Sequence, residues 1–73
     1  MNERIENLAL DAGLLNYVDN ETPRRYFING HADLEEVQKF AEMIVRECAD
    51  IATINQYQSY TPGHYVLKHF GVE

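Results

Sequence analysis

The chain has 73 residues, 45% of them hydrophobic and 25% charged, and its twelve acidic residues against six lysines and arginines give a formal charge of −6. This length predicts a single small domain (1–73) with a marginal core, and the composition is too apolar for a disordered chain. The acidic charge argues against general nucleic-acid binding, and no apolar run approaches the roughly 20 residues that span a bilayer.

The N-terminal residues lack the basic and apolar regions of a signal peptide, so we expect a cytoplasmic protein. The single cysteine cannot form an internal disulfide. Because a chain this small has little core of its own, self-association is the leading way to gain one.

A short amphipathic helix is predicted over residues 2–12. Its apolar side chains recur at helical spacing, at Ile5, Leu8, Ala9 and Ala12. Acidic residues near the start and Gly13 at the end fit the two helix termini.

The next stretch, residues 14–30, holds two β-favouring runs, 14–18 and 25–28, on either side of a turn-rich segment. A small β-hairpin is therefore one possibility and an irregular segment the other. Asn29-Gly30 is a strong turn signal, but no strand follows it.

A long helix is predicted from Asp33 to about Asn55. Asp33 caps it, and Glu36 completes the capping box three residues later. One apolar stripe runs along it, through Leu34, Val37, Ala41, Ile44, Cys48 and Ile51, and is widened by Phe40, Val45 and Ala52. A stripe this wide favours burial on more than one side, and we expect a homodimer or higher oligomer packed through Val37, Phe40, Ile44 and Ile51.

A last short helix begins with Thr61 as its cap and Pro62 at its first position, and Gly71 ends it. The expected fold class is therefore mainly α. It has one long central helix between short N- and C-terminal helices, with the possible hairpin between residues 14 and 30, in an oligomeric assembly.

Segments of this chain resemble a group of short bacteriophage accessory proteins of unassigned role. The resemblance lies in residues 40–50 (FAEMIVRECAD), the ending 68–72 (KHFGV) and the opening 1–14, about half the chain. It implies a phage-encoded protein in the host cytoplasm. Because small phage proteins of this kind commonly block a host enzyme or defence system, it also implies a counter-defence role.

No enzyme signature is present: a phosphate-binding glycine loop, H-E-x-x-H, C-x-x-C and G-x-S-x-G are all absent. We therefore expect a non-catalytic protein that needs no cofactor. Cys48 lies on the apolar stripe and is interpreted as a packing residue. His64 and His69 are five residues apart, which is not the spacing that places two imidazoles on one helical face, so no metal site is predicted.

Charge is distributed unevenly. No acidic residue occurs between Glu21 and Asp33 or between Asp50 and Glu73, and cations and aromatic residues alternate in both gaps. If the gaps meet, within a subunit or across a dimer, arginine would grip phosphate while an aromatic ring stacks on a base. The candidate ligand-binding residues are Arg24, Arg25, Tyr26, Tyr60, His64, Tyr65, Lys68 and His69; the alternative is that the arginines lie on a solvated loop and the rings complete a core.

Two functions follow. In the first, a homo-oligomer binds and sequesters a small anionic nucleotide-derived immune signal. In the second, the protein is an inhibitor that docks on a host or phage enzyme through its acidic helix or through residues 17–31.

Overall fold

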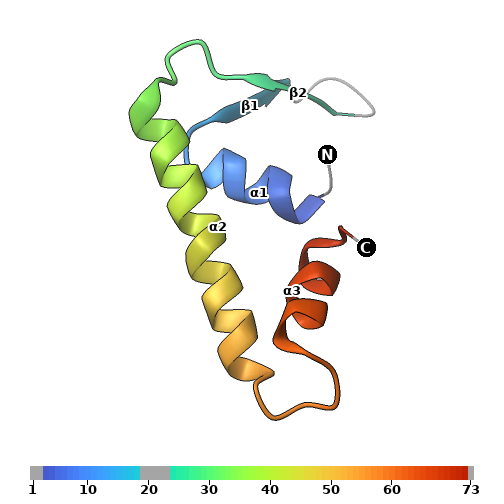
Figure 1. The fold of residues 1–73 in the computed structure, drawn as a ribbon. Helices are drawn as coiled ribbons and strands as arrows, with labels where there is room; N and C mark the ends of the chain where they lie inside the picture. The colour runs from blue at the N-terminus through green and yellow to red at the C-terminus, as the bar shows by residue number, and fades with distance from the viewer. Residues whose placement is uncertain (1–2, 19–23, 73) are drawn as a thin grey trace.

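Three helices and one β-hairpin make up the fold in the computed structural model, which describes residues 3–18 and 24–72 (Figure 1). The elements follow one another as α1 (Glu3–Asp11), β1 (Leu15–Val18), β2 (Arg25–Ile28), α2 (Leu34–Ile54) and α3 (Pro62–Phe70). This confirms the mainly helical fold with a long central helix. It also decides the open question of the hairpin, because Leu15–Val18 and Arg25–Ile28 pair as antiparallel strands.

Helix α1 ends where the sequence indicates. Gly13 adopts a φ of 81°, a left-handed conformation that costs glycine little, and the Leu14 amide then donates to the Ala9 carbonyl at 2.9 Å. This turn sends the chain directly into β1.

Strands β1 and β2 are antiparallel, with Leu15 opposite Ile28 and Tyr17 opposite Tyr26. The two tyrosine rings meet edge to face, with centroids 6.1 Å apart. The turn predicted at Asn29 follows β2, and there the Asn29 side chain accepts a hydrogen bond from the His31 amide at 3.1 Å.

Helix α2 begins and ends as predicted. The Glu35 amide donates to the Asp33 side chain at 3.0 Å and the Asp33 amide donates to the Glu36 carboxylate at 2.8 Å, completing the capping box. Hydrogen bonding with Glu36, followed by the Glu35 amide, holds the pKa of Asp33 below its ordinary 3.8. Asn55 closes the other end.

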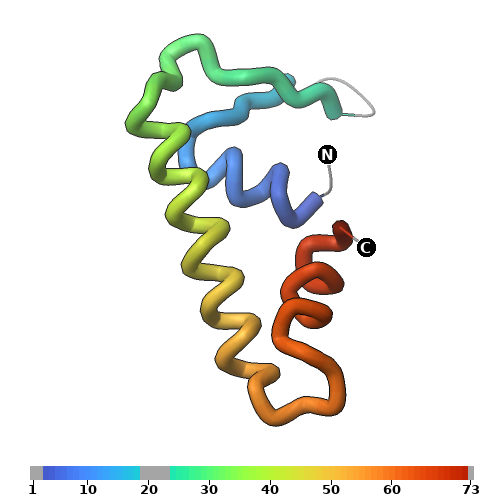
Figure 2. The backbone as a smooth tube through the Cα atoms, viewed as in Figure 1, coloured from blue at the N-terminus to red at the C-terminus, as the bar shows by residue number. Residues whose placement is uncertain are grey.

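After α2 the chain reverses over residues 55–61 and α3 returns beside the helix it has just left (Figure 2). Thr61 caps α3, Pro62 is its first residue, and Gly71 ends it in a left-handed conformation with a φ of 67°. Both α1 and α3 pack on the same side of α2, as does the hairpin end of the chain (Figure 1).

The buried core is small and lies around α1. Among the described residues its apolar members are Leu8, Ala9, Ala12, Leu15 and Phe70. No residue of α2 is fully buried. The radius of gyration is 14.4 Å, against about 11 Å for a compact domain of this length, so the long helix extends beyond what the rest of the chain covers.

Candidate functional site

Glu47 of α2 contacts one side chain from each of the other two helices, on the face of α2 that points toward α1 and α3, which we call the inner face. Its Oε1 atom forms an ion pair with Arg4 of α1 and lies 3.2 Å from Nε2 of His69 in α3. The Glu47 side chain is mostly buried, and its other oxygen, Oε2, has no hydrogen-bond partner among the described residues. This cluster joins the two short helices to the long one.

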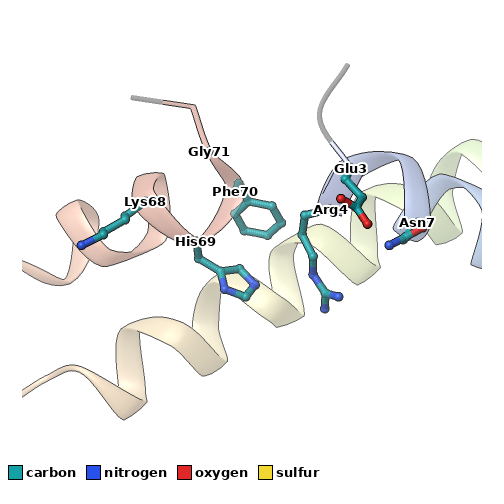
Figure 3. Close-up of a pocket in the computed structure, with 7 residues that line it drawn as sticks. All are labelled: Glu3, Arg4, Asn7, Lys68, His69, Phe70 and Gly71. Carbon is teal, nitrogen blue, oxygen red and sulfur yellow. The ribbon is translucent and has the colours of Figure 1, made fainter. Parts of the chain in front are cut away.

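A hollow of about 390 Å³ lies beside this cluster, between the start of α1 and the end of α3 (Figure 3). Its lining residues are Glu3, Arg4, Asn7, Lys68, His69, Phe70 and Gly71. Two predicted ligand-binding residues, Lys68 and His69, are therefore here.

The charges around the hollow largely cancel. Glu47 engages both Arg4 and His69, Glu3 adds a second carboxylate, and the Lys68 ammonium points away from Arg4 (Figure 3). A cation already paired with a carboxylate is a poor phosphate ligand, because the anion must first displace its partner. The arrangement suits a joint between helices better than an anion site.

The predicted site residues on the hairpin lie elsewhere. Arg24 places its guanidinium 4.2 Å from the ring centre of Tyr17, where it stacks as a cation on an aromatic face. Arg25 and Tyr26 are in β2, at the end of the molecule opposite the 55–61 connection, and α1 lies between the hairpin and α3 (Figure 1). Within one subunit, the structure thus separates the hairpin residues from those on and before α3.

A third group of predicted residues forms a contiguous aromatic cluster. Tyr60 stacks on His64 with ring centroids 4.6 Å apart, and Tyr65 meets His64 edge to face at 5.2 Å. The cluster fixes the start of α3 against the connection from α2, and it leaves the Tyr60 side chain 65% exposed.

Next to this cluster, the same end of the molecule exposes two more large apolar groups. Tyr57 is 92% exposed and Ile54 is 71% exposed. We call Ile54, Tyr57 and Tyr60 the aromatic end. It lies within residues 51–67, which contain no Asp, Glu, Lys or Arg, so it is an uncharged surface on a protein of charge −6.

The residues predicted for self-association are divided by the fold. Phe40, Ile44 and Ile51 lie seven, three and four residues from Glu47, which places them on the inner face toward α1 and α3, and all three are half-buried. Val37 is exposed. The first half of α2 carries an open apolar band made of Leu34, Val37, Ala41 and Val45, and we call these four the bare stripe. Ile54, at the end of the helix, is exposed as well and belongs to the aromatic end.

Three carboxylates, those of Asp33, Glu35 and Glu36, lie within 4.8 Å of one another. Their proximity follows from the capping box at the start of α2. None of the helices in the described part of the chain combines the length and apolar content needed to cross a bilayer.

Comparison of the chain with protein-family models, with curated proteins and with solved structures finds no match. The function must therefore be argued from the surfaces described above.

Proposed function

We propose that this protein acts by binding, without catalysis, as an inhibitor that docks on a partner protein through the aromatic end. The observation that supports this most strongly is the near-complete exposure of Tyr57, at 92%, between two other exposed apolar side chains. A side chain this exposed adds little to the stability of the subunit and is available to a partner.

The composition of this surface is that of a protein-binding site. Interface centres are enriched in aromatic residues and depleted of charged ones, and tyrosine is among the residues that contribute most binding energy. The aromatic end has both properties, since residues 51–67 carry no Asp, Glu, Lys or Arg. Nucleic acid is a poor fit, because no cation accompanies the rings in this segment apart from a protonated His64.

The aromatic end is also held in place. Tyr60 is fixed by its stacking on His64, and Thr61 accepts a hydrogen bond from the His64 amide at 3.3 Å. Pre-ordering lowers the entropy lost when a partner binds. In the phage setting that the resemblance implies, the partner is a host enzyme or defence protein.

The test uses Tyr57→Ala, with Gln58→Ala as the matched control. Both side chains are exposed and uncharged and lie outside the helices, so neither change disturbs the core. The tagged protein is used to capture a partner from host cells, and the partner is then purified and titrated by calorimetry.

A binding hot spot loses at least about 2 kcal/mol on truncation, or about 30-fold in Kd, so Tyr57→Ala should bind at least that much more weakly. Gln58→Ala should bind as the wild type does. Equal affinity of all three proteins for the partner, or the absence of any captured partner, would refute the proposal.

A second candidate is sequestration of a small anionic nucleotide, and the position of Lys68 favours it. Lys68 follows His64 by four residues and Tyr65 by three, so it lies one helical turn from two residues whose rings could stack on a base. It is exposed and has no ion-pair partner among the described residues. The hairpin arginines would join such a site only from a second subunit.

Calorimetric titration with cyclic dinucleotides and ADP-ribose tests this candidate. Lys68→Ala should weaken binding roughly tenfold, in line with the loss of one charge-assisted hydrogen bond, whereas Lys39→Ala, an exposed lysine on α2, should have no effect. No binding by the wild type removes the candidate.

A further inference from the structure

One flank of α2 carries a band of exposed apolar side chains, the bare stripe, which the rest of the described chain leaves open; α1 and α3 pack on another side of the helix (Figure 1). Leu34 is 84% exposed, Val45 66% and Val37 48%, and the exposed methyl of Ala41 lies between them. These residues are spaced by three and four positions, so they form one continuous band along about three turns of the helix. Apolar groups this exposed and this continuous indicate an interaction surface.

The chain as a whole exposes more surface than a compact monomer of its mass. The chain exposes 5550 Å², about 900 Å² more than the roughly 4,650 Å² expected of a compact monomer with a mass of 8.5 kDa. A standard protein interface buries about 800 Å² on each partner. The surplus is spread over the bare stripe, the aromatic end and the hairpin, and it is large enough to supply one side of a dimer contact of which the bare stripe is the apolar centre.

We infer that a second copy of this chain covers the bare stripe, with the two α2 helices packed antiparallel. Ala41 lies near the middle of the band, and its small side chain lets two helices approach closely at the two-fold axis. With Ala41 opposite its own copy, Val37 faces Val45 and Leu34 faces Cys48. Larger side chains thus fill the space on both sides of the axis, as knobs do in helix packing.

Charge selects the antiparallel direction. The three carboxylates of Asp33, Glu35 and Glu36 gather at the start of α2. Parallel helices would bring two such clusters together, and like charges at that distance repel. Antiparallel helices separate the clusters and also align the helix dipoles favourably.

Light scattering after size exclusion tests the assembly at micromolar concentration. The wild type should have a mass of about 17 kDa, twice the 8.5 kDa of one chain. Val45→Glu should be a helical monomer, because Val45 is exposed in the subunit and its replacement disturbs only the dimer. Thr53→Glu, which introduces the same charge at an exposed position off the stripe, should remain a dimer. A monomeric wild type, or a dimeric Val45→Glu with unchanged affinity, overturns the inference.

Cysteine cross-linking in a Cys48→Ala background tests the direction. In the antiparallel register, Ala41→Cys should form a disulfide-linked dimer on oxidation and Leu34→Cys should not, because the two copies of residue 34 lie far apart. Parallel helices would cross-link at both positions, and that result overturns the antiparallel arrangement. Circular dichroism of each variant confirms that the helices are retained.

Discussion

Replacing Glu47 by glutamine removes the negative charge that pairs with Arg4 of α1 and contacts His69 of α3. Glutamine has nearly the same size and helix propensity, so the change isolates the electrostatic contribution of the cluster. Arg4 loses its ion pair and His69 loses a charged hydrogen-bond partner at 3.2 Å. We expect the folded state to be destabilised without a change of fold.

The magnitude follows from burial. A hydrogen bond to a charged group contributes about 1.5 to 3 kcal/mol where water is excluded. The Arg4 side chain is 44% exposed and the His69 side chain 30% exposed. Solvent therefore screens part of the energy of their contacts with Glu47. Oε2 of Glu47 is buried without a described partner, a cost already present in the wild type that the variant partly relieves. A net loss of about 1 to 2 kcal/mol results, well short of the 3 to 5 kcal/mol lost when a fully buried pair is broken.

Thermal unfolding followed by circular dichroism measures this loss. For a domain of this size, 1 kcal/mol lowers Tm by about 4 to 8 °C, so Glu47→Gln should melt roughly 5 to 15 °C below the wild type. Glu42→Gln is the control, because the Glu42 carboxylate is exposed and bonds only to Gln38 of its own helix among the described residues, at 3.1 Å; its effect should be under about 0.5 kcal/mol. Equal melting temperatures for the two variants would show that the cluster does not join the helices.

Three further changes test other parts of the fold. Asp33 has a folded pKa below 3.8, chiefly through hydrogen bonding with Glu36, so its stabilisation is complete above about pH 4 and is lost as pH falls through the folded pKa. Asp33→Asn keeps the cap but should show a smaller drop in Tm on acidification, and identical acid profiles would contradict this. Phe70→Ala removes the ring at the end of α3, which is 5% exposed, and should cost about 3 to 5 kcal/mol, enough to unfold much of a domain this small, whereas Leu67→Ala on the exposed side should melt near the wild type. Cys48 is half-buried in the subunit, so a thiol reagent should label it in a dilute sample and more slowly as the dimer forms; a rate independent of protein concentration would speak against its place in the interface.

Local signals predicted the helices and their ends well. Each of these signals acts within about four residues, so it can be recognised in the sequence. The signals are the capping box at Asp33, the proline at the first position of α3 and the glycine that ends α3, Gly71. The sequence does not decide on the hairpin, because β-favouring runs of four residues fit either a strand or a loop. Pairing of Tyr17 with Tyr26 and packing of Leu15 in the core supply the missing energy.

The Glu47 cluster could not be predicted in the same way. Arg4 and His69 lie 43 and 22 residues from Glu47, and no local pattern joins positions that far apart. The sequence interpretation placed His69 in a ligand site because it lies in an acid-free segment. Folding brings to it a carboxylate from the long helix instead. A segment that contains no Asp or Glu can still lie beside a carboxylate from another part of the folded chain.

Helical periodicity identified a wide apolar stripe on α2 but not which part of it the chain covers. Phe40 and Ile44 face inward, and Leu34 and Val45 do not. That division depends on where α1 and α3 pack, which is on the side of α2 that carries Glu47. The width of the stripe therefore indicated that part of it stays open within one subunit, whereas which residues are open needed the structure.

The two proposed surfaces together predict how a partner is bound. Ile54 lies 13 residues beyond Ala41, or about 20 Å along α2, so in the antiparallel dimer the two aromatic ends are about 40 Å apart. A small domain is about 30 Å across and cannot contact both. The dimer should therefore bind two partner molecules, one at each end, and a partner that is itself dimeric gains avidity only if its sites match that spacing. Val45→Glu separates the two surfaces experimentally: it should abolish the two-to-two complex while leaving the affinity of a single aromatic end for a monomeric partner unchanged.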